Sequence, residues 1–284
     1  MSANSGRRNA FLDEMGLGPL WTRRDAQAIP DAPPVQEDAF AAPATGHAPA
    51  VENAGMQRQA RPSIPSIPAM PAQEAGLPVH PSAPDSADVA QMDWAALKAN
   101  VAGCVKCDLC RGRTRTVFGV GDEKARWLFI GEGPGRNEDL KGEPFVGQAG
   151  KLLDNMLVSM GLRRGDNAYI ANIVKCRPTD DNGRDRPPTP DEVAACLPYL
   201  ERQIALIQPT MLVALGKTAA LALLGLDADT PVSRLRGKVH RYAGLPLVVT
   251  YHPAYLLRNM ADKRKSWEDL SLAMATFASA DLAE

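Results

Sequence analysis

The stretch GEGPGRNEDLKGEPFVG, residues 131–147, combines residue types that can bind a ligand and act on it. It follows the short apolar run 127–130, which predicts a buried strand. Its glycines allow backbone N–H groups to come close to a ligand, while four acidic residues offer carboxylates and Phe145 offers an aromatic face. This combination indicates a pocket for a flat ligand that carries carbonyl oxygens.

Two further polar side chains stand near the ends of predicted strands. Asn172 lies in the strand predicted at 168–174, and His252 directly follows the strand predicted at 246–250. An asparagine amide pairs a donor with an acceptor, which matches the edge of an imide or amide ring. A single histidine is more often structural than catalytic, but this one lies where an α/β sheet binds its ligands. With Phe145, these residues predict a pocket for a hydrogen-bonding heterocycle, a base rather than a phosphate.

The five cysteines form a second constellation. Cys104 and Cys107 make a CxxC pair with Cys110 close behind, whereas Cys176 and Cys196 lie far downstream, separated by 19 residues. A thioredoxin-type pair begins a helix after a strand, and a zinc ribbon usually has two tight pairs, so neither pattern fits well. Four thiolates from two parts of the chain fit an iron–sulfur cluster at least as well as zinc. Spacing alone leaves the metal open, and ordinary buried core cysteines at 176 and 196 are the alternative.

Two glycine motifs resemble nucleotide-binding loops but do not fulfil them. Residues 131–135 read GxGxG, and they are not followed by the helix with a tight third glycine that a dinucleotide fingerprint requires. Gly216-Lys217-Thr218 follows a predicted strand, but Met211 stands where a phosphate-binding loop needs its first glycine. The sequence therefore argues against an enzyme that uses ATP or NAD.

The elements that must position these residues alternate along the chain. Strands are predicted at 126–131, 168–174, 211–215 and 246–250, and helices at 92–101, 149–160, 190–207, 217–224 and 265–278. The third helix begins with Thr189-Pro190-Asp191-Glu192, the pattern of a capping box with proline at the first helical position. Short apolar strands that alternate with helices predict a three-layer α/β/α fold with a short, mainly parallel central sheet. Ligands of such a sheet bind at the carboxyl ends of its strands.

Length and composition limit the class of protein. The chain has 284 residues, a formal net charge of −1 and 45% hydrophobic residues, which fits one or two globular domains. No apolar run approaches the roughly 18 residues of a membrane helix, and the N-terminus lacks the apolar core of a secretory signal. We therefore expect a cytoplasmic protein whose cysteines serve as thiols or metal ligands.

The first 90 residues differ from the rest of the chain. They hold 13 of the 24 prolines and lack periodic apolar positions, which predicts a disordered tail before a folded domain at 91–284. Residues 9–25 are an exception, because their apolar residues, among them Phe11 and Trp21, are spaced for a short amphipathic helix. This segment is either a frayed terminal helix or a site for a protein partner.

The predicted domain is mildly basic, with 26 Lys and Arg against 23 Asp and Glu. Its basic residues gather in five clusters: Arg111/Arg113/Arg115, Arg163/Arg164, Arg184/Arg186, Arg234/Arg236/Lys238/Arg241 and Arg258/Lys263/Arg264/Lys265. Such clusters are usually solvated faces, but five of them in one small domain favour a polyanionic partner.

Four ordered motifs resemble one known family. They are CxxC followed by GRT, then GEGPG…ED…GxPFVGxAG, then NIVKCRP, and finally HPAYLLR. The series is similar to that of the family-4 uracil-DNA glycosylases, the iron–sulfur type, over essentially all of residues 91–284. The resemblance implies a uracil-DNA glycosylase-like fold. It also implies an enzyme of base excision repair that flips uracil out of DNA and hydrolyses its N-glycosidic bond.

The resemblance assigns the cysteines. It implies that Cys104, Cys107, Cys176 and Cys196 hold a [4Fe-4S] cluster, while Cys110 is a spare thiol. A scaffold role is expected for this cluster, because hydrolysis moves no electrons.

The resemblance also implies how a flipped-out uracil is bound. Phe145 would stack on the base, and Asn172 would hydrogen-bond its O4/N3 edge and so exclude cytosine. The backbone at Glu132 and Gly133 would line the pocket. His252 would donate a hydrogen bond to O2, where negative charge develops as the bond to the sugar breaks.

Contacts to the DNA and the activation of water complete the picture that the resemblance implies. Leu256 would fill the gap in the duplex as a wedge, and Arg258 would contact phosphate. Related glycosylases outside this family use an aspartate at the position of Gly133, so the resemblance does not identify the carboxylate that orients water. Glu132, Glu138 and Asp139 are the candidates, and the last two could equally be capping or salt-bridge residues.

Two rival functions remain at this point. A related type traps uracil covalently through a histidine, but CRPTDDNGRDRPPTPDEVAAC contains none, which favours a turnover enzyme. The other rival is a non-catalytic metal-containing DNA-binding module or polymerase accessory. The expected partners are uracil-containing DNA and, for residues 9–25, a protein. We expect a monomer that does not engage a membrane.

Overall fold

The computed structural model describes residues 86–281. The amphipathic segment at 9–25 and the predicted tail up to residue 85 lie outside the described residues. The helices are α2 (Ser86–Gln91), α3 (Trp94–Ala102), α4 (Leu109–Gly112), α5 (Arg136–Lys141), α6 (Gln148–Ser159), α7 (Pro190–Ile207), α8 (Lys217–Leu224), α9 (Val232–Leu235), α10 (Pro253–Arg258) and α11 (Lys263–Asp281), with a 3₁₀ helix at Met260–Asp262. The strands are β1 (Val120–Gly121), β2 (Trp127–Gly131), β3 (Ala168–Asn172), β4 (Met211–Leu215), β5 (Val239–Tyr242) and β6 (Leu245–Thr250).

The strands form one sheet in the order β1-β3-β2-β4-β6-β5. Its inner strands β3, β2, β4 and β6 are parallel, and Trp127 of β2 lies opposite Ala168 of β3 and Met211 of β4. The edge strands β1 and β5 pair in the antiparallel direction. The prediction of a short, mainly parallel sheet is confirmed, and its inner strands end at one common edge.

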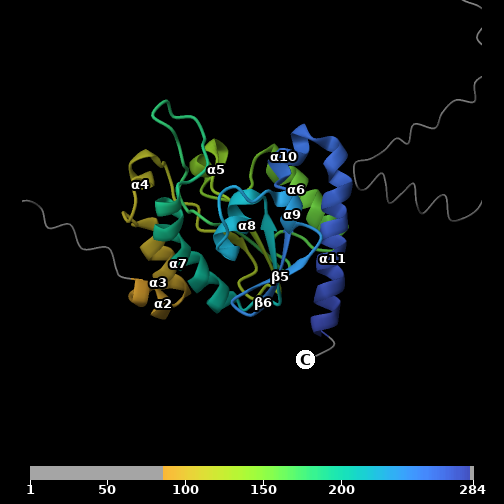
Figure 1. The fold of residues 1–284 in the computed structure, drawn as a ribbon. Coiled ribbons are helices and arrows are strands. Elements are labelled where there is room, and N and C mark those ends of the chain that lie inside the picture. The colour runs from red at the N-terminus through yellow and green to blue at the C-terminus, as the bar shows by residue number, and fades with distance from the viewer. Residues whose placement is uncertain (1–85, 282–284) are drawn as a thin grey trace, which may run out of the picture. The chain divides into compact units, whose positions relative to one another are not determined.

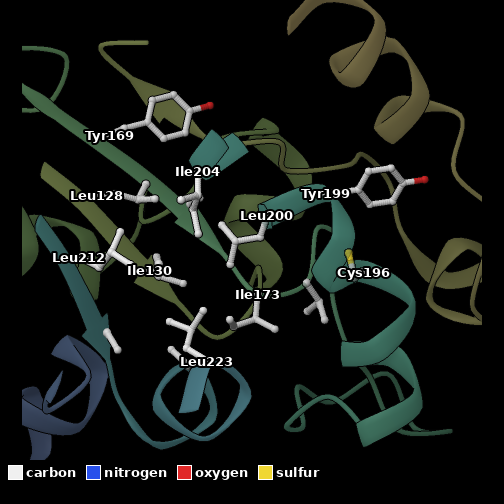
Figure 2. Packing of buried hydrophobic residues seen from close by; sticks show 14 of the residues in the cluster. Leu128, Ile130, Tyr169, Ile173, Cys196, Tyr199, Leu200, Ile204, Leu212 and Leu223 are labelled. Carbon is white, nitrogen blue, oxygen red and sulfur yellow. The ribbon is translucent and has the colours of Figure 1, made fainter. Parts of the chain in front are cut away.

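The sheet separates two apolar cores. Leu128 and Ile130 of β2 pack with α2, α3, α7 and α8, whereas Trp127 and Phe129 face the other side and pack with α6 and α11. Figure 1 shows these helices on the two sides of the sheet. Figure 2 shows the first core, where strand residues such as Leu128 point toward Leu200 of α7. The three-layer α/β/α fold is therefore confirmed.

The start of α7 is fixed as the capping box predicts. The Thr189 hydroxyl accepts a hydrogen bond from the Glu192 N–H, and the Glu192 carboxylate accepts one from the Thr189 N–H at 2.8 Å. Arg186 adds two hydrogen bonds to the same carboxylate, at 2.6 and 2.8 Å. These bonds satisfy orphan N–H groups of the first turn and so anchor the helix that carries Cys196.

Several short elements lie where no helix or strand was predicted from the sequence. Helix α5 occupies the middle of the 131–147 stretch, α10 follows His252, and β1 and β5 form the edges of the sheet. Each is too short or too exposed to show apolar periodicity: β1 has two residues, and Asp139 is the buried residue of α5. Among residues 86–281, no helix combines the length and the apolar character needed to cross a membrane.

Helix α2 crosses the predicted domain boundary at residues 90 and 91. Its Val89 is fully buried and belongs to the core that α7 helps to form. The packed structure thus includes Ser86–Gln91 rather than beginning at residue 91. A truncated form of the protein should keep this helix.

Replacing Val89 with alanine tests this boundary. Because the side chain is fully buried, we expect the free energy of unfolding to fall by about 2 kcal/mol and the melting temperature by about 4–8 °C. The control is Gln91→Ala at an exposed position of the same helix, which should change stability by less than about 0.5 kcal/mol. Equal melting temperatures for the two variants would show that α2 does not contribute to the fold.

Candidate active site and cysteine cavity

A cavity of about 520 Å³ opens where the inner strands end. It is lined by Glu132, Gly133, Pro134, Gly135, Glu138, Phe145, Ala149, Asn172, Pro178, Asp185, Arg186, Pro187, His252, Ala254, Tyr255 and Arg258. We call it the strand-end cavity. Of the residues predicted to bind or act on the base and the DNA, all but Asp139 and Leu256 lie in this lining.

Phe145, Asn172 and His252 lie next to one another in this cavity. The rings of Phe145 and His252 are nearly parallel, with centroids 5.4 Å apart and planes inclined by 29°. Gly131, at the end of β2, lies close to both Asn172 and Phe145. A Cβ at this position would overlap Asn172 Oδ1 and lie 2.7 Å from Phe145 Cζ. The three side chains can therefore contact one planar ligand, as the sequence predicts.

Phe145 is held in a backbone conformation that residues other than glycine rarely adopt. Its φ is 54°, in the left-handed region. Arg164 donates a hydrogen bond to its carbonyl oxygen at 2.9 Å, and Glu138 accepts hydrogen bonds from the next two N–H groups at 3.0 and 3.2 Å. A Cβ at Gly150 would overlap the same carbonyl oxygen, so only glycine fits there. The surrounding residues over-determine the ring's position, which is typical of strain at a functional site.

Asn172 presents an unused hydrogen-bonding atom to the cavity. The residue ends β3 and is buried, yet within the described part of the chain its Oδ1 has no hydrogen-bond partner. Buried polar atoms are almost always paired, and an exception calls for a ligand or another explanation. This atom therefore supports a ligand whose polar edge meets Asn172.

His252 is a neutral donor. It caps the N-terminus of α10, where its Nδ1 accepts a hydrogen bond from the Ala254 N–H at 3.2 Å. Burial lowers the pKa of His252 to about 4, and the charge of Arg258 adds to this effect. Because Nδ1 is the acceptor, the single ring proton of the neutral form is on Nε2. The imidazole can therefore donate one hydrogen bond to a ligand at neutral pH.

The three candidate carboxylates have different surroundings. Glu132 receives a hydrogen bond from the Thr218 hydroxyl, and burial raises the pKa of Glu132 above its usual range. Glu138 uses one oxygen to hold the loop that carries Phe145. Asp139 is buried away from the cavity and accepts hydrogen bonds from the N–H groups of Thr114 and Arg115. Asp139 therefore has a structural role, and its prediction as a catalytic candidate is not supported by its position.

The prediction of Leu256 as a wedge meets a similar contradiction. Its side chain is 1% exposed and belongs, with Leu152 and Met156 of α6, to the lining of a separate cavity, whereas Leu257 is 42% exposed. The reason is the helix α10, which the sequence analysis did not predict. Helical spacing places Pro253 and Leu256 on the inner face and turns the next residue outward.

Two features of the site were not predicted from the sequence: a residue that binds Glu132 and a segment that lines the cavity. Thr218 belongs to the motif that resembles a phosphate loop, but its hydroxyl binds Glu132 instead. The segment 178–187 lines the cavity with Asp185 and Arg186, and it folds back on itself through the pairing of Thr179 with Asp185. The segment directly follows the motif NIVKCRP, which carries Asn172, and this position in the sequence could have indicated that it lies near the cavity.

A second cavity gathers all five cysteines: Cys104, Cys107, Cys110, Cys176 and Cys196 line it. None of them forms a disulfide. Figure 2 shows Cys196 on α7, shortly before Leu200 of the first core. We call this space the cysteine cavity. The cysteines predicted to share a metal site are therefore brought together, and Cys110 joins them.

Two donors point at sulfur atoms in the cysteine cavity. Arg113 Nη1 lies 3.2 Å from Cys176 Sγ, and the Lys175 N–H lies 3.2 Å from Cys196 Sγ. Burial raises the pKa of the Cys196 thiol to about 12, so its thiolate needs positive charge close by. Among residues 86–281, no three potential ligands converge on a point that would suit a single metal ion.

Comparison with known proteins agrees with this geometry. Residues 118–271 match the family model of the uracil DNA glycosylase superfamily. A type-4 uracil-DNA glycosylase of Archaeoglobus fulgidus is 50% identical over 163 residues, which cover 55% of this chain and 79% of that protein. A type-4 enzyme of Pyrobaculum aerophilum is 41% identical, covering 64% of this chain and 93% of that protein.

The similarity also separates two types within the superfamily. A type-5 uracil-DNA glycosylase of Thermus thermophilus is 32% identical to this chain, over 49% of this chain and 68% of that protein. Both type-4 relatives are more similar and cover a larger share of this chain. The chain therefore belongs to the uracil DNA glycosylase superfamily and, within it, to the type-4 uracil-DNA glycosylases.

Proposed function

We propose that this protein is a hydrolase that removes uracil from DNA and leaves an abasic site, the opening reaction of base excision repair. The observation that carries this proposal is the strand-end cavity, where Phe145, Asn172 and His252 surround one slot and Asn172 Oδ1 has no partner among the described residues. The membership of the type-4 family supports it independently.

Uracil recognition follows from these three side chains. Phe145 stacks on the base, and the amide of Asn172 pairs with its O4/N3 edge. Cytosine presents the reversed donor–acceptor pattern at that edge and leaves buried polar groups unpaired, which is a strong basis for exclusion. The extruded base enters the strand-end cavity, whose lining also includes Glu132, Gly133 and residues of the segment 178–187.

Bond breaking places negative charge on the uracil and positive charge on the sugar. The Nε2–H of His252 donates to uracil O2, where the charge accumulates. Because this imidazole is neutral and its Nδ1 is held by the Ala254 N–H, its donor is oriented before the reaction begins, and it gives hydrogen-bond stabilisation without a proton transfer.

Glu132 is the carboxylate that we assign to water and to the sugar cation. It lines the cavity, and the Thr218 hydroxyl holds one oxygen while leaving the other for a ligand. Glu138 is the alternative, but one of its oxygens already accepts two backbone hydrogen bonds. Ionised Glu132 can orient the attacking water and stabilise the oxocarbenium ion.

Exchanging Glu132 for glutamine removes the charge but retains the shape. We expect the single-turnover rate of uracil release to fall about 10²-fold. Burial raises the pKa of Glu132, so the wild-type rate should fall as the pH drops through a value above the usual ~4.3 of glutamate. The variant should lack this acid limb, and rates measured from about pH 4 to pH 8 would show it.

Glu138→Gln is the matched control for this experiment. Its amide oxygen can still accept from the N–H groups of Val146 and Gly147. We expect a smaller loss of rate and an unchanged acid limb. A larger loss for this variant than for Glu132→Gln would transfer the role to Glu138.

DNA is held by groups around the mouth of the cavity. Arg258 lines the cavity and is exposed, so it can contact a phosphate beside the extruded nucleotide. Leu257, rather than the buried Leu256, presents an apolar side chain that can enter the stack. Such contacts offset the few kcal/mol that extrusion of a base costs.

The cysteine cavity fits a [4Fe-4S] cluster. Cys104, Cys107, Cys176 and Cys196 would hold it, and Cys110 is the spare thiol. Sulfur atoms of a zinc site share one ion at about 2.3 Å, so they must converge on one point. A cubane separates its thiolates further, which suits cysteines that line one cavity without such a point among the described residues. Donors aimed at the sulfurs of Cys176 and Cys196 also suit cluster thiolates. When bound, the cluster would cross-link the segments around it.

Release of free uracil from a uracil-containing oligonucleotide tests the proposal. The wild-type protein should release uracil and leave alkali-sensitive abasic DNA, while the same oligonucleotide with cytosine or thymine stays intact. Binding without release would favour a non-catalytic DNA-binding module. Release from single-stranded and double-stranded substrates should be measured side by side.

Other features of the protein are inferred in the same way. We propose a monomer as the active unit. Five free cysteines suit a reducing compartment and thus the cytoplasm. The segment 9–25, outside the described residues, is proposed to bind a protein partner.

A further inference from the structure

Lys175 is a buried lysine in the lining of the cysteine cavity. Its side chain is 1% exposed, and Nζ donates hydrogen bonds to the Asn172 carbonyl oxygen at 2.9 Å and to Gln203 Oε1 at 2.6 Å. Burying an ammonium group is costly unless it is paired or hydrogen-bonded. A residue that bears this cost at one fixed place invites a functional explanation.

The main chain of Lys175 belongs to the cysteine cavity. Its N–H donates to Cys196 Sγ at 3.2 Å, its carbonyl oxygen accepts from the Val117 N–H at 2.8 Å, and the next residue is Cys176. Its position therefore depends on two of the proposed cluster ligands. Any shift of these cysteines moves the Cα from which the lysine side chain extends.

The end of the Lys175 side chain reaches the main chain of Asn172, which lines the strand-end cavity. Gln203 is fully buried, and its Nε2 donates to the Phe118 carbonyl oxygen at 2.9 Å, which fixes the amide that receives the ammonium group. The other acceptor is the carbonyl oxygen of Asn172, so Nζ holds the peptide group that follows the base-reading residue. That peptide group is attached to the Cα from which the Asn172 side chain extends.

We propose that Lys175 is a positioning residue that couples the cysteine cavity to Asn172, so that accurate reading of the base depends on it. This inference rests on the proposed function. A bound cluster would then have a specific structural role, because its ligands Cys176 and Cys196 would fix the main chain around residue 175 and the ammonium group would pass that placement to Asn172. Lys175 itself does not touch the base.

The test is a double-mutant cycle with Lys175→Met and Asn172→Ala in the full-length protein. Methionine is similar in length but cannot donate a hydrogen bond. On the wild-type background, we expect Lys175→Met to lower the single-turnover rate of uracil release about 10–10²-fold, the usual cost of a small misplacement. On the Asn172→Ala background, the same change should cost less than about 3-fold, because its effect acts through the side chain already removed.

Three controls make the result interpretable. Lys98→Met, at an exposed position of α3, should leave the rate unchanged. The visible absorbance and iron content of Lys175→Met should equal those of the wild type. If Lys175→Met does not fold, Gln203→Met removes one acceptor of the ammonium group and should show a smaller loss with the same dependence on Asn172.

Equal losses from Lys175→Met on both backgrounds would overturn the inference, because a general structural role is additive. Loss of iron in a folded Lys175→Met variant would also overturn it, since the lysine would then serve the cysteines alone. Failure of the wild type to release uracil would instead refute the proposed function, so the two failures are distinguishable.

Discussion

Changing His252 to alanine is expected to lower the rate of uracil release about 10²–10³-fold, the typical effect of removing one preorganised donor at a developing anion. The donor is the Nε2–H of a partly buried imidazole whose Nδ1 accepts from the Ala254 N–H. Water can enter the space left by the ring, but it is not held in place before the reaction. Single-turnover rates on a uracil-containing duplex measure this effect, and the cluster absorbance should not change.

The pH profile separates His252 from a general acid. Burial lowers its pKa to about 4, so the ring is neutral over the whole range of about pH 5.5–8 in which an ordinary histidine titrates. The wild-type rate should therefore show no limb near pH ~6.5. A limb at that pH that vanishes in His252→Ala would mean that the imidazole transfers a proton, contrary to the proposed role.

Substitution of Cys176 by serine should have the second large effect, on the fold rather than on the chemistry. The residue is buried beside Arg113 and Cys196 and is proposed to bind the cluster. Because metal binding and folding are coupled, we expect loss of iron and a fall in melting temperature of about 10 °C or more, with little soluble protein. Iron analysis, visible absorbance and thermal melting measure the outcome.

Cys110→Ser is the matched control, since Cys110 lines the same cavity but is assigned no iron. It should retain iron, absorbance and uracil release. Iron loss in this variant with iron retained in Cys176→Ser would exchange the roles of the two residues. A colourless, iron-free wild-type protein with full activity would remove the cluster from the proposal altogether.

The fold was largely predictable because the four inner strands are short and apolar, and three of them are buried throughout. The rule that ligands bind at the carboxyl ends of such strands led to Asn172 and His252, and the structure places both in one cavity with Phe145. These predictions rest on local signals, namely apolar runs, glycines and a capping box. Local signals survive in a single sequence.

Side-chain direction was harder to predict. Leu256 and Asp139 lie in the correct segments but point away from the cavity, because the short helices α10 and α5 set their orientation. Each helix has only 6 residues, which is too short for apolar periodicity to reveal its phase. The contact between Thr218 and Glu132 joins residues far apart in the sequence, and no local pattern contains it.

The backbone around Phe145 has a consequence for engineering. Gly150, Arg164 and Glu138 form the frame that keeps this residue at positive φ. Changes to the frame would deform the pocket rather than alter which base it prefers. Ala149 and Ala254 line the same cavity with small side chains and carry none of these bonds. A library that reshapes the pocket for bulkier damaged bases should therefore vary such small lining positions and leave the frame intact.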